Sequence, residues 1–214
     1  MVVLCGCSVK RNNFFSRNYH QLTTRYNVYF NGDQALKSGI KHMENRHKED
    51  YTHLLPVFVS NDEQTRSICS SDMDYVIEKA AKAIDKHSIT AKPRRRKNKD
   101  SKNYQTFRKK KEFNNQLDKC YLLLGNFYKK KYTMANNTFR FIQRQYAEDE
   151  ALMTEVSIWL FRSLTEMGRY EEAARIMDRL DGSTLKRKQR EMVAAARTDF
   201  YVRQGMYEQT IPEA

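Results

Sequence analysis

The chain has 214 residues, enough to bury a core as one domain or as two small ones. Glycine and proline are scarce, at 7 and 3 residues, which disfavours sandwiches and barrels and favours an all-α fold. The formal net charge is +13, and no apolar run is long enough to span a membrane.

The first segment, residues 1–16, contains a pattern typical of lipid attachment. Leu4-Cys5-Gly6-Cys7 matches a bacterial lipobox, in which an apolar residue and two small residues precede the acylated cysteine. Cys7 would carry the diacylglycerol, and the polar residues after it would form a tether. A basic start and a full apolar core are missing ahead of it, so we expect translation to begin upstream or the sequence to be trimmed. The alternative is a short apolar N-terminus with incidental cysteines.

Residues 17–91 predict an N-terminal helical region built of repeat-like helix pairs. Apolar residues at helical spacing predict two helices that are broken at Asn31-Gly32. An extended linker around Pro56 follows them. Residues 71–74 are suited to cap a further helix, which runs to His87.

Residues 92–112 predict a basic linker. From Lys92 to Lys111 there are eleven basic residues and one acid, a local excess of ten that leaves only about +3 for the rest of the chain. Because the segment has almost no apolar content, we expect a solvated loop. One hypothesis makes it a site for a polyanion such as anionic lipid, lipopolysaccharide or nucleic acid, and the other makes it a linker only. The candidate polyanion contacts are Arg94, Arg95, Arg96, Lys97, Lys109, Lys110 and Lys111.

Residues 113–214 carry a repeat in which Gly168-Arg-Tyr170-Glu-Glu-Ala173 returns as Gly205-Met-Tyr207-Glu-Gln-Thr210, with an earlier, degraded copy at 130–135. Tyr132, Tyr170 and Tyr207 are 38 and 37 residues apart, a period typical of stacked helix pairs. We expect Gly168 and Gly205 to end a first helix in a left-handed conformation and the tyrosines after them to open the second helix. The alanine three residues later would let the two helices approach closely. The repeat-defining residues are Gly125, Tyr128, Tyr132, Ala135, Gly168, Tyr170, Ala173, Gly205 and Tyr207.

This pattern resembles the tetratricopeptide repeat from about Asn114 to the C-terminus. The resemblance implies an α-solenoid whose last unit is cut in mid-repeat, so we expect a fragment of a longer protein. Solenoids of this kind usually hold other proteins on an extended surface. First helices of the pairs usually line that surface, which makes the exposed positions of 114–130 and 150–167 the candidate partner contacts.

Motifs along the whole chain resemble one family, the tetratricopeptide lipoproteins of type IX secretion and gliding motility in Bacteroidetes, of the PorW/SprE type. The motifs are the lipobox, Arg17-Asn-Tyr19-His20, Thr24-Arg-Tyr26-Asn27, Phe30-Asn-Gly32, Ala35-Leu36, Leu54-Leu-Pro-Val57, Glu78-Lys-Ala80, Lys82-Ala-Ile84, His87-Ser88, the basic insert and Leu123-Leu-Gly125. The resemblance implies a lipid-anchored scaffold on the periplasmic face of the outer membrane. Its partners would be other proteins of the secretion and gliding apparatus, and nucleic acid would not be among them.

No pattern in the sequence predicts an enzyme. The chain has no phosphate loop, no Gly-x-Ser-x-Gly turn and no His-Glu-x-x-His motif. His42 and His47 are five residues apart, which places them off one helix face and argues against a shared metal. Cys69 falls in a polar loop, and Cys120 falls on an apolar helix stripe where we expect it to be buried and inert. We therefore expect no cofactor, no metal and no small-molecule substrate.

Overall fold

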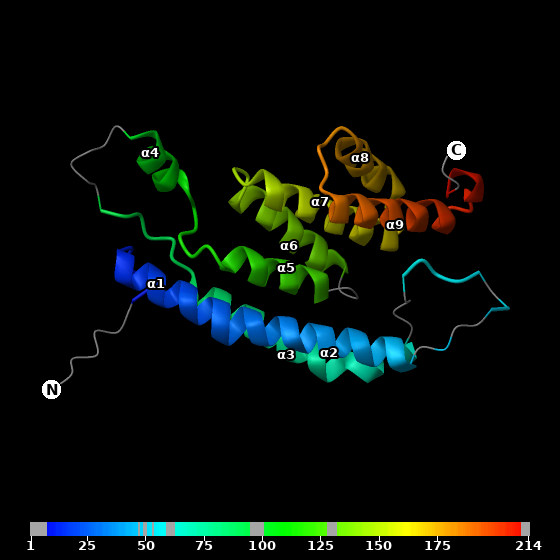
Figure 1. Cartoon of the computed structure of the whole chain (residues 1–214), viewed down its shortest axis with the longest axis horizontal. Coiled ribbons are helices and arrows are strands. Elements are labelled where there is room, and N and C mark those ends of the chain that lie inside the picture. The colour runs from blue at the N-terminus through cyan, green and yellow to red at the C-terminus, as the bar shows by residue number, and fades with distance from the viewer. Residues whose placement is uncertain are drawn as a thin grey trace.

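The computed structural model describes residues 8–46, 48, 51–52, 54–58, 63–94, 101–127 and 132–210. All regular structure in these ranges is helical, as the composition predicts, and they contain no strand. Figure 1 shows α1, α2 and α3 along one side of the molecule, α5 to α9 along the other, and α4 apart from both groups. The elements are α1 (Phe14–Thr23), η1 (Thr24–Tyr29), α2 (Phe30–Arg46), α3 (Glu63–His87), α4 (Lys102–Lys109), α5 (Leu117–Phe127), α6 (Tyr132–Gln145), α7 (Glu150–Glu166), α8 (Tyr170–Asp181), α9 (Arg187–Arg203) and η2 (Tyr207–Thr210).

The N-terminal helix is continuous from α1 through α2. Asn13 caps its start, with the side-chain oxygen accepting from the Ser16 N–H at 2.7 Å. A π-helical segment, η1, joins α1 to α2. The predicted break at Asn31-Gly32 is wrong, because both residues lie inside α2. Glycine permits a helix to end but does not force it to, and here α2 packs along α3.

The next helix, α3, ends at His87 as predicted but begins earlier, at Glu63. The polar residues 71–74, which suggested a cap, lie within this helix, and so does Cys69, which was wrongly expected in a loop. Capping preference is a local signal that a longer helix overrides when its other residues pack. Residues 54–56 around the proline have no regular structure, in agreement with the predicted linker.

One apolar core runs from α3 to α9. In a smaller cluster Ala80 and Ala83 of α3 pack against Leu117 and Cys120 of α5. A larger cluster joins α5 to α9, and Tyr121 packs against both clusters. Each helix from α5 to α7 contacts the next in the chain, α7 also contacts α8 and α9, and α3 packs against α5. The N-terminal helices are therefore part of the same packed body as α5 to α9.

The two repeat glycines end their helices in the same way. Gly168 has φ +69° and Gly205 has φ +73°, the left-handed conformation that the sequence predicts. After α7, the Gly168 N–H donates to the Thr165 carbonyl at 3.0 Å and the next N–H to the Leu164 carbonyl at 2.9 Å. After α9 the same two bonds recur at 3.0 and 2.9 Å. Both turns are complete Schellman motifs.

Each of the three repeat tyrosines begins a helical segment, as predicted. Tyr132 is the first residue of α6, Tyr170 of α8 and Tyr207 of the 3₁₀ turn η2. The Tyr170 ring meets the buried ring of Phe200 edge-on, with centroids 5.8 Å apart, and so covers the junction of α8 and α9.

Candidate partner-binding face and basic segment

The structure also describes Ala135, Ala173 and Gly125 of the remaining repeat-defining residues. Ala135 and Ala173 are buried, in keeping with close approach of the paired helices. Gly125 lies inside α5, and Tyr128 lies outside the described residues. Cys120 is fully buried, and burial raises the pKa of its thiol to about 12, so it stays protonated and unreactive at neutral pH.

Few of the predicted partner contacts on the first helices are exposed among the side chains that can be placed. Within 114–122, at 124 and within 150–167, the exposed side chains are Asn115, Glu150, Ala151 and Glu155. The first helices instead present half-buried polar side chains, which sequence reasoning did not single out. Aromatic residues beside a basic residue at helical spacing are the signal that could have identified them.

The most distinctive such set, here called the α7–α9 face, is centred on Arg162. Its guanidinium carbon lies 3.7 Å from the centroid of the Phe58 ring and 4.8 Å from that of the Trp159 ring. Phe58 comes from the segment between α2 and α3, so two aromatic rings from distant parts of the sequence hold one cation. The face consists of Trp159, Arg162 and Glu166 on α7 and Asp199 and Arg203 on α9.

Two opposing effects shift the pKa of Arg162 on this face. Burial lowers the pKa of the Arg162 guanidinium, while the charges of Glu166 and Asp199 raise it. Asp199 is itself buried and accepts from the Arg203 Nε–H at 2.8 Å. The Trp159 Nε1–H and the Arg162 Nε–H find no hydrogen-bond acceptor among the described residues. Arg162 therefore has aromatic rings beside its guanidinium, and its Nε–H and the Trp159 Nε1–H have no oxygen acceptor among the described residues.

A second half-buried polar group lies between α5 and α6. The Asp118 Oδ1 and the Tyr146 hydroxyl are buried without a hydrogen-bond partner in the described chain. Burial raises the pKa of the Asp118 carboxyl and also the pKa of the Tyr146 phenol. It raises the pKa of the nearby Tyr121 phenol to about 12.

Residues 102–109 of the basic segment form α4, contrary to the predicted loop. Two lysines fix it in place. The Lys92 Nζ donates to the Arg108 and Lys110 carbonyls at 2.9 and 2.8 Å, and the Lys111 Nζ donates to the Arg144 carbonyl in the last turn of α6 at 2.9 Å. Lys111 therefore has a structural role that its place in a charge run does not reveal.

The predicted polyanion contacts are only partly brought together. Arg94, Lys109 and Lys110 are exposed and lie at the two ends of the segment. Arg95, Arg96 and Lys97 lie outside the described residues, as does the predicted lipidation site, Cys7.

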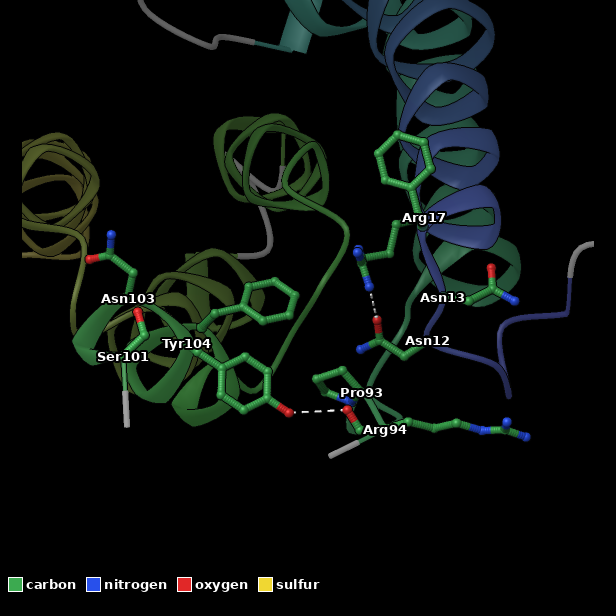
Figure 2. Close-up of a pocket in the computed structure, with 10 residues that line it drawn as sticks. Asn12, Asn13, Arg17, Pro93, Arg94, Ser101, Asn103 and Tyr104 are labelled. Atoms are coloured by element: carbon green, nitrogen blue, oxygen red, sulfur yellow. Dashed lines mark hydrogen bonds between the residues drawn. The ribbon is translucent and has the colours of Figure 1, made fainter. Parts of the chain in front are cut away.

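A cavity of about 540 Å³ lies between the start of α1 and α4, and none of its lining residues carries a carboxylate. Figure 2 shows Arg17 reaching toward the Asn12 side chain, to which its Nη1 donates at 2.6 Å. The Arg17 guanidinium also lies 5.2 Å from the Phe107 ring centroid. On the opposite wall, the Tyr104 hydroxyl donates to the Arg94 carbonyl at 3.0 Å (Figure 2). The lining residues are Asn12, Asn13, Phe14, Arg17, Pro93, Arg94, Ser101, Asn103, Tyr104 and Phe107.

A buried polar network holds the end of α3 against α1 and the start of α5. The His20 and His87 Nδ1 atoms are 2.8 Å apart, so one nitrogen donates and the other accepts. Burial, and secondarily the charge on His20, lowers the pKa of His87. The Asn114 amide donates to the Thr24 hydroxyl at 2.9 Å and to the His87 carbonyl at 3.0 Å. The Glu112 carboxylate completes the network.

No protein-family model and no curated protein matches the chain. In the part of the chain that the structure describes, none of the helices is long and apolar enough to cross a membrane. Over the same residues, no three side chains of the metal-binding types histidine, cysteine, aspartate and glutamate come together.

Proposed function

We propose that the protein is a helical-repeat scaffold that binds partner proteins. The observation that carries this proposal is the recurrence of one structural unit in which a Schellman glycine is followed two residues later by a helix-opening tyrosine. The unit occurs after α7 and after α9, at the spacing that the sequence repeat gives. Identical helix–turn–helix junctions at a fixed period are typical of stacked repeats, whose usual role is to present an extended surface.

In this proposal the fold is a tetratricopeptide-like α-solenoid. The pairs α5–α6 and α7–α8 and the start of a pair at α9–η2 are its successive units. Support comes from the contacts of α7 with both α6 and α9, since a first helix in such an array packs against the pair on either side.

The α7–α9 face is the proposed partner contact. Arg162 already accepts an aromatic side chain from this chain, because the Phe58 ring stacks on its guanidinium. A partner segment with an aromatic side chain beside a carboxylate or a free carbonyl would suit the same place. Its ring would replace Phe58, and its oxygen would accept from the N–H groups of Trp159 and Arg162 that now find no acceptor in the described chain.

The proposed location is the periplasmic face of the outer membrane, with a lipid on Cys7 as the anchor. The proposed partners are proteins of a type IX secretion and gliding apparatus. The support for both is the ordered set of motifs along the sequence, from the lipobox to Leu123-Leu-Gly125. Mass spectrometry of the N-terminal peptide after membrane fractionation tests this part. A triacylated Cys7 in the outer membrane supports it, and an unmodified Met1 in the cytosol overturns it.

Charge reversal on the α7–α9 face tests partner binding. The bait carries Arg162→Glu, and the matched control carries Arg187→Glu, a charge reversal at an exposed arginine at the start of α9. Partners captured from an envelope extract are identified by mass spectrometry for each bait. We expect the control to retain a defined partner and Arg162→Glu to lose about tenfold or more of it. Equal capture by a folded Arg162→Glu bait would refute this face as the contact.

A second candidate function is favoured by the cavity beside α4. Two arginines and no carboxylate line it, and the exposed Lys109 and Lys110 follow at the end of the same helix, so a polyanion is a chemically suitable ligand. Heparin binding tests it by salt titration, with Arg94→Gln, Lys109→Gln and Lys110→Gln combined as the variant. A steep salt dependence that the variant flattens supports polyanion binding, whereas a flat response in the unaltered chain excludes it.

A further inference from the structure

The outer side of the N-terminal helix carries a line of large apolar side chains that are at least half exposed. Here called the outer stripe, it has exposed fractions between 50% and 78%. Its members are Phe15, Tyr19, Leu22, Tyr26 and Phe30. Single exposed apolar residues are common on protein surfaces, but a contiguous line of them marks a surface that meets another apolar phase.

The stripe remains straight because of the π-helical segment. Its members are spaced by four, three, four and four residues, and the last step crosses η1. There the Phe30 N–H donates to the Arg25 carbonyl five residues back, which makes a wider turn than an α-helix has. Tyr29 consequently turns inward and packs against the cluster between α3 and α5, while Phe30 stays on the outside.

The inner side of the same helix is polar, which reverses the usual amphipathic arrangement. Ser16, His20 and Thr24 are 2%, 3% and 0% exposed. Their polar groups are used in place: the Ser16 hydroxyl donates to the Ser8 carbonyl at 3.1 Å, and the Thr24 hydroxyl accepts from the Asn114 amide at 2.9 Å. Along α1 the inward side chains are therefore polar and hydrogen-bonded, and apolar packing against the cluster begins only at Tyr29, so the residues of the outer stripe are left facing outward.

The charges beside the outer stripe indicate what kind of surface would cover it. Residues 8–30 contain four basic residues and no acidic residue: Lys10, Arg11, Arg17 and Arg25. The Arg25 guanidinium lies 5.4 Å from the ring centroid of Tyr26, so a cation sits directly beside the stripe. Arg17 is turned toward Asn12 and Phe107, so the exposed cations here are Lys10, Arg11 and Arg25. A second copy of the chain would bring two such sets of like charges together along one contact, which opposes dimerisation through this face. An anionic surface is complementary to it.

We propose that the outer stripe lies in the interfacial layer of an anionic phospholipid bilayer, with α1 and η1 parallel to the membrane plane. Phenylalanine and leucine would enter the acyl boundary, the two tyrosines would keep their hydroxyls at headgroup level, and the exposed Lys10, Arg11 and Arg25 would face the phosphates. The stripe binds membrane by itself and does not require a lipid on Cys7. A lipid on Cys7 would strengthen this membrane binding. Cys7 is seven residues before Phe14, a span of at most about 25 Å, so the lipid and the stripe could enter the same bilayer.

Flotation with lipid vesicles tests the stripe in the full chain without its possible anchor. The protein carries Cys5→Ser and Cys7→Ser, and the vesicles are phosphatidylcholine alone or with about 30% phosphatidylglycerol. The stripe variant combines Phe15→Gln, Leu22→Gln and Tyr26→Gln. The matched control combines Leu54→Gln and Tyr207→Gln, two apolar residues of similar exposure away from the stripe. Circular dichroism verifies that each variant is folded.

We expect the unaltered stripe to bind the anionic vesicles, the control to bind equally, and the stripe variant to bind about tenfold or more weakly. Removing the charge of Lys10, Arg11 and Arg25 should weaken binding to anionic vesicles by about fivefold per charge. Failure of the unaltered stripe to bind, or equal binding by the stripe variant, overturns the proposal. Self-association that is lost in the stripe variant, without vesicle binding, would assign the stripe to a second copy instead. Neither result bears on capture through the α7–α9 face.

Discussion

At the scale of single residues, Glu112 holds together the junction of the N-terminal helices and the repeats. It is 6% exposed, and its Oε1 accepts from the N–H groups of Ile89, Phe113 and Asn114 at 2.8 to 2.9 Å. Its Oε2 accepts from the Ser88 hydroxyl at 2.6 Å. A buried carboxylate is stable only when it is satisfied in this way, so the side chain and its donors depend on each other.

Replacement of Glu112 by alanine should therefore destabilise the fold. It would leave the Ile89 and Asn114 N–H groups buried without their acceptor, so we expect the free energy of unfolding to fall by about 3 kcal/mol. Urea unfolding monitored by circular dichroism measures it. Glu148→Ala, at an exposed position before α7, is the control and should change stability by less than about 0.5 kcal/mol. A loss below about 1 kcal/mol in Glu112→Ala would show that water replaces the carboxylate.

The histidine pair should make stability depend on pH. Burial and the facing His20 lower the pKa of His87 below its ordinary 6.5, so the unfolded chain takes up the proton more readily than the folded one. Stability is then full above about pH 6.5 and is lost as the pH falls from there toward the folded pKa.

The melting temperature measured from about pH 7.5 to about pH 5 checks this expectation. His87→Gln should show a shallower decline than the unaltered chain, because it removes the group whose pKa differs between the two states. His42→Gln, at an exposed position on α2, should leave the slope unchanged. Parallel slopes for the unaltered chain and His87→Gln would contradict a role for the pair.

Residue-level features of this kind were beyond sequence reasoning. Asn114 meets Thr24 across 90 positions of the chain, and His20 meets His87 across 67. Nothing in the local sequence of either residue indicates its partner, because the contact exists only after α1, α3 and α5 pack. Cys120 was predictable by contrast, since its burial follows from the apolar spacing of its own helix.

At the scale of elements, the two Schellman turns differ from the third glycine turn of the C-terminal half. Gly168 and Gly205 have positive φ, and a Cβ at either position would meet no atom within 4 Å. Gly182 follows α8 with φ −78°, where a Cβ would make ordinary contact at 3.9 Å. Any loss of stability on adding a methyl group at Gly168 or Gly205 would therefore come from the strained left-handed backbone and not from a steric clash.

We expect Gly168→Ala to destabilise the protein by about 1 to 2 kcal/mol and Gly182→Ala to change stability little or to raise it slightly. The two variants add the same atom after neighbouring helices, so their difference isolates the left-handed conformation. Gly168→Asn should cost less than Gly168→Ala, because asparagine tolerates that conformation better. Denaturant midpoints measure all three, and equal midpoints for Gly168→Ala and Gly182→Ala would contradict the assignment.

Element prediction succeeded where the signal was local and repeated, and failed where packing decided. Glycine followed by tyrosine marked both turns because the left-handed residue and the helix start lie within three positions of each other. Asn31-Gly32 offered the same kind of signal once, and packing of α2 on α3 overrode it. The charge run concealed α4, because helix propensity in lysine and arginine is high even where apolar content is low.

At the scale of the whole molecule, the basic segment interrupts the chain but not the packing. Residues before it and after it contribute to the same cluster, where Ala83 of α3 meets Leu117 and Cys120 of α5. Hydrogen bonds cross in the same place: Gln21 donates to the Phe113 carbonyl at 3.2 Å, and the Phe113 N–H donates to the Ile89 carbonyl at 3.0 Å. The peptide bonds of the segment are therefore not what holds the two parts together.

Two fragments, 1–100 and 101–214, should consequently associate when they are co-expressed. We expect an affinity tag on one to recover the other in equal amount, because the α3–α5 contact and the Glu112 network reform between them. Ala83→Glu places a charge in the buried contact and should abolish recovery, whereas Ala194→Glu, at an exposed position of α9, should not. Size-exclusion chromatography of the recovered pair should match the intact chain. Two fragments that each stay soluble and never co-purify would show that the connection is needed, and the single packed body would then depend on chain continuity.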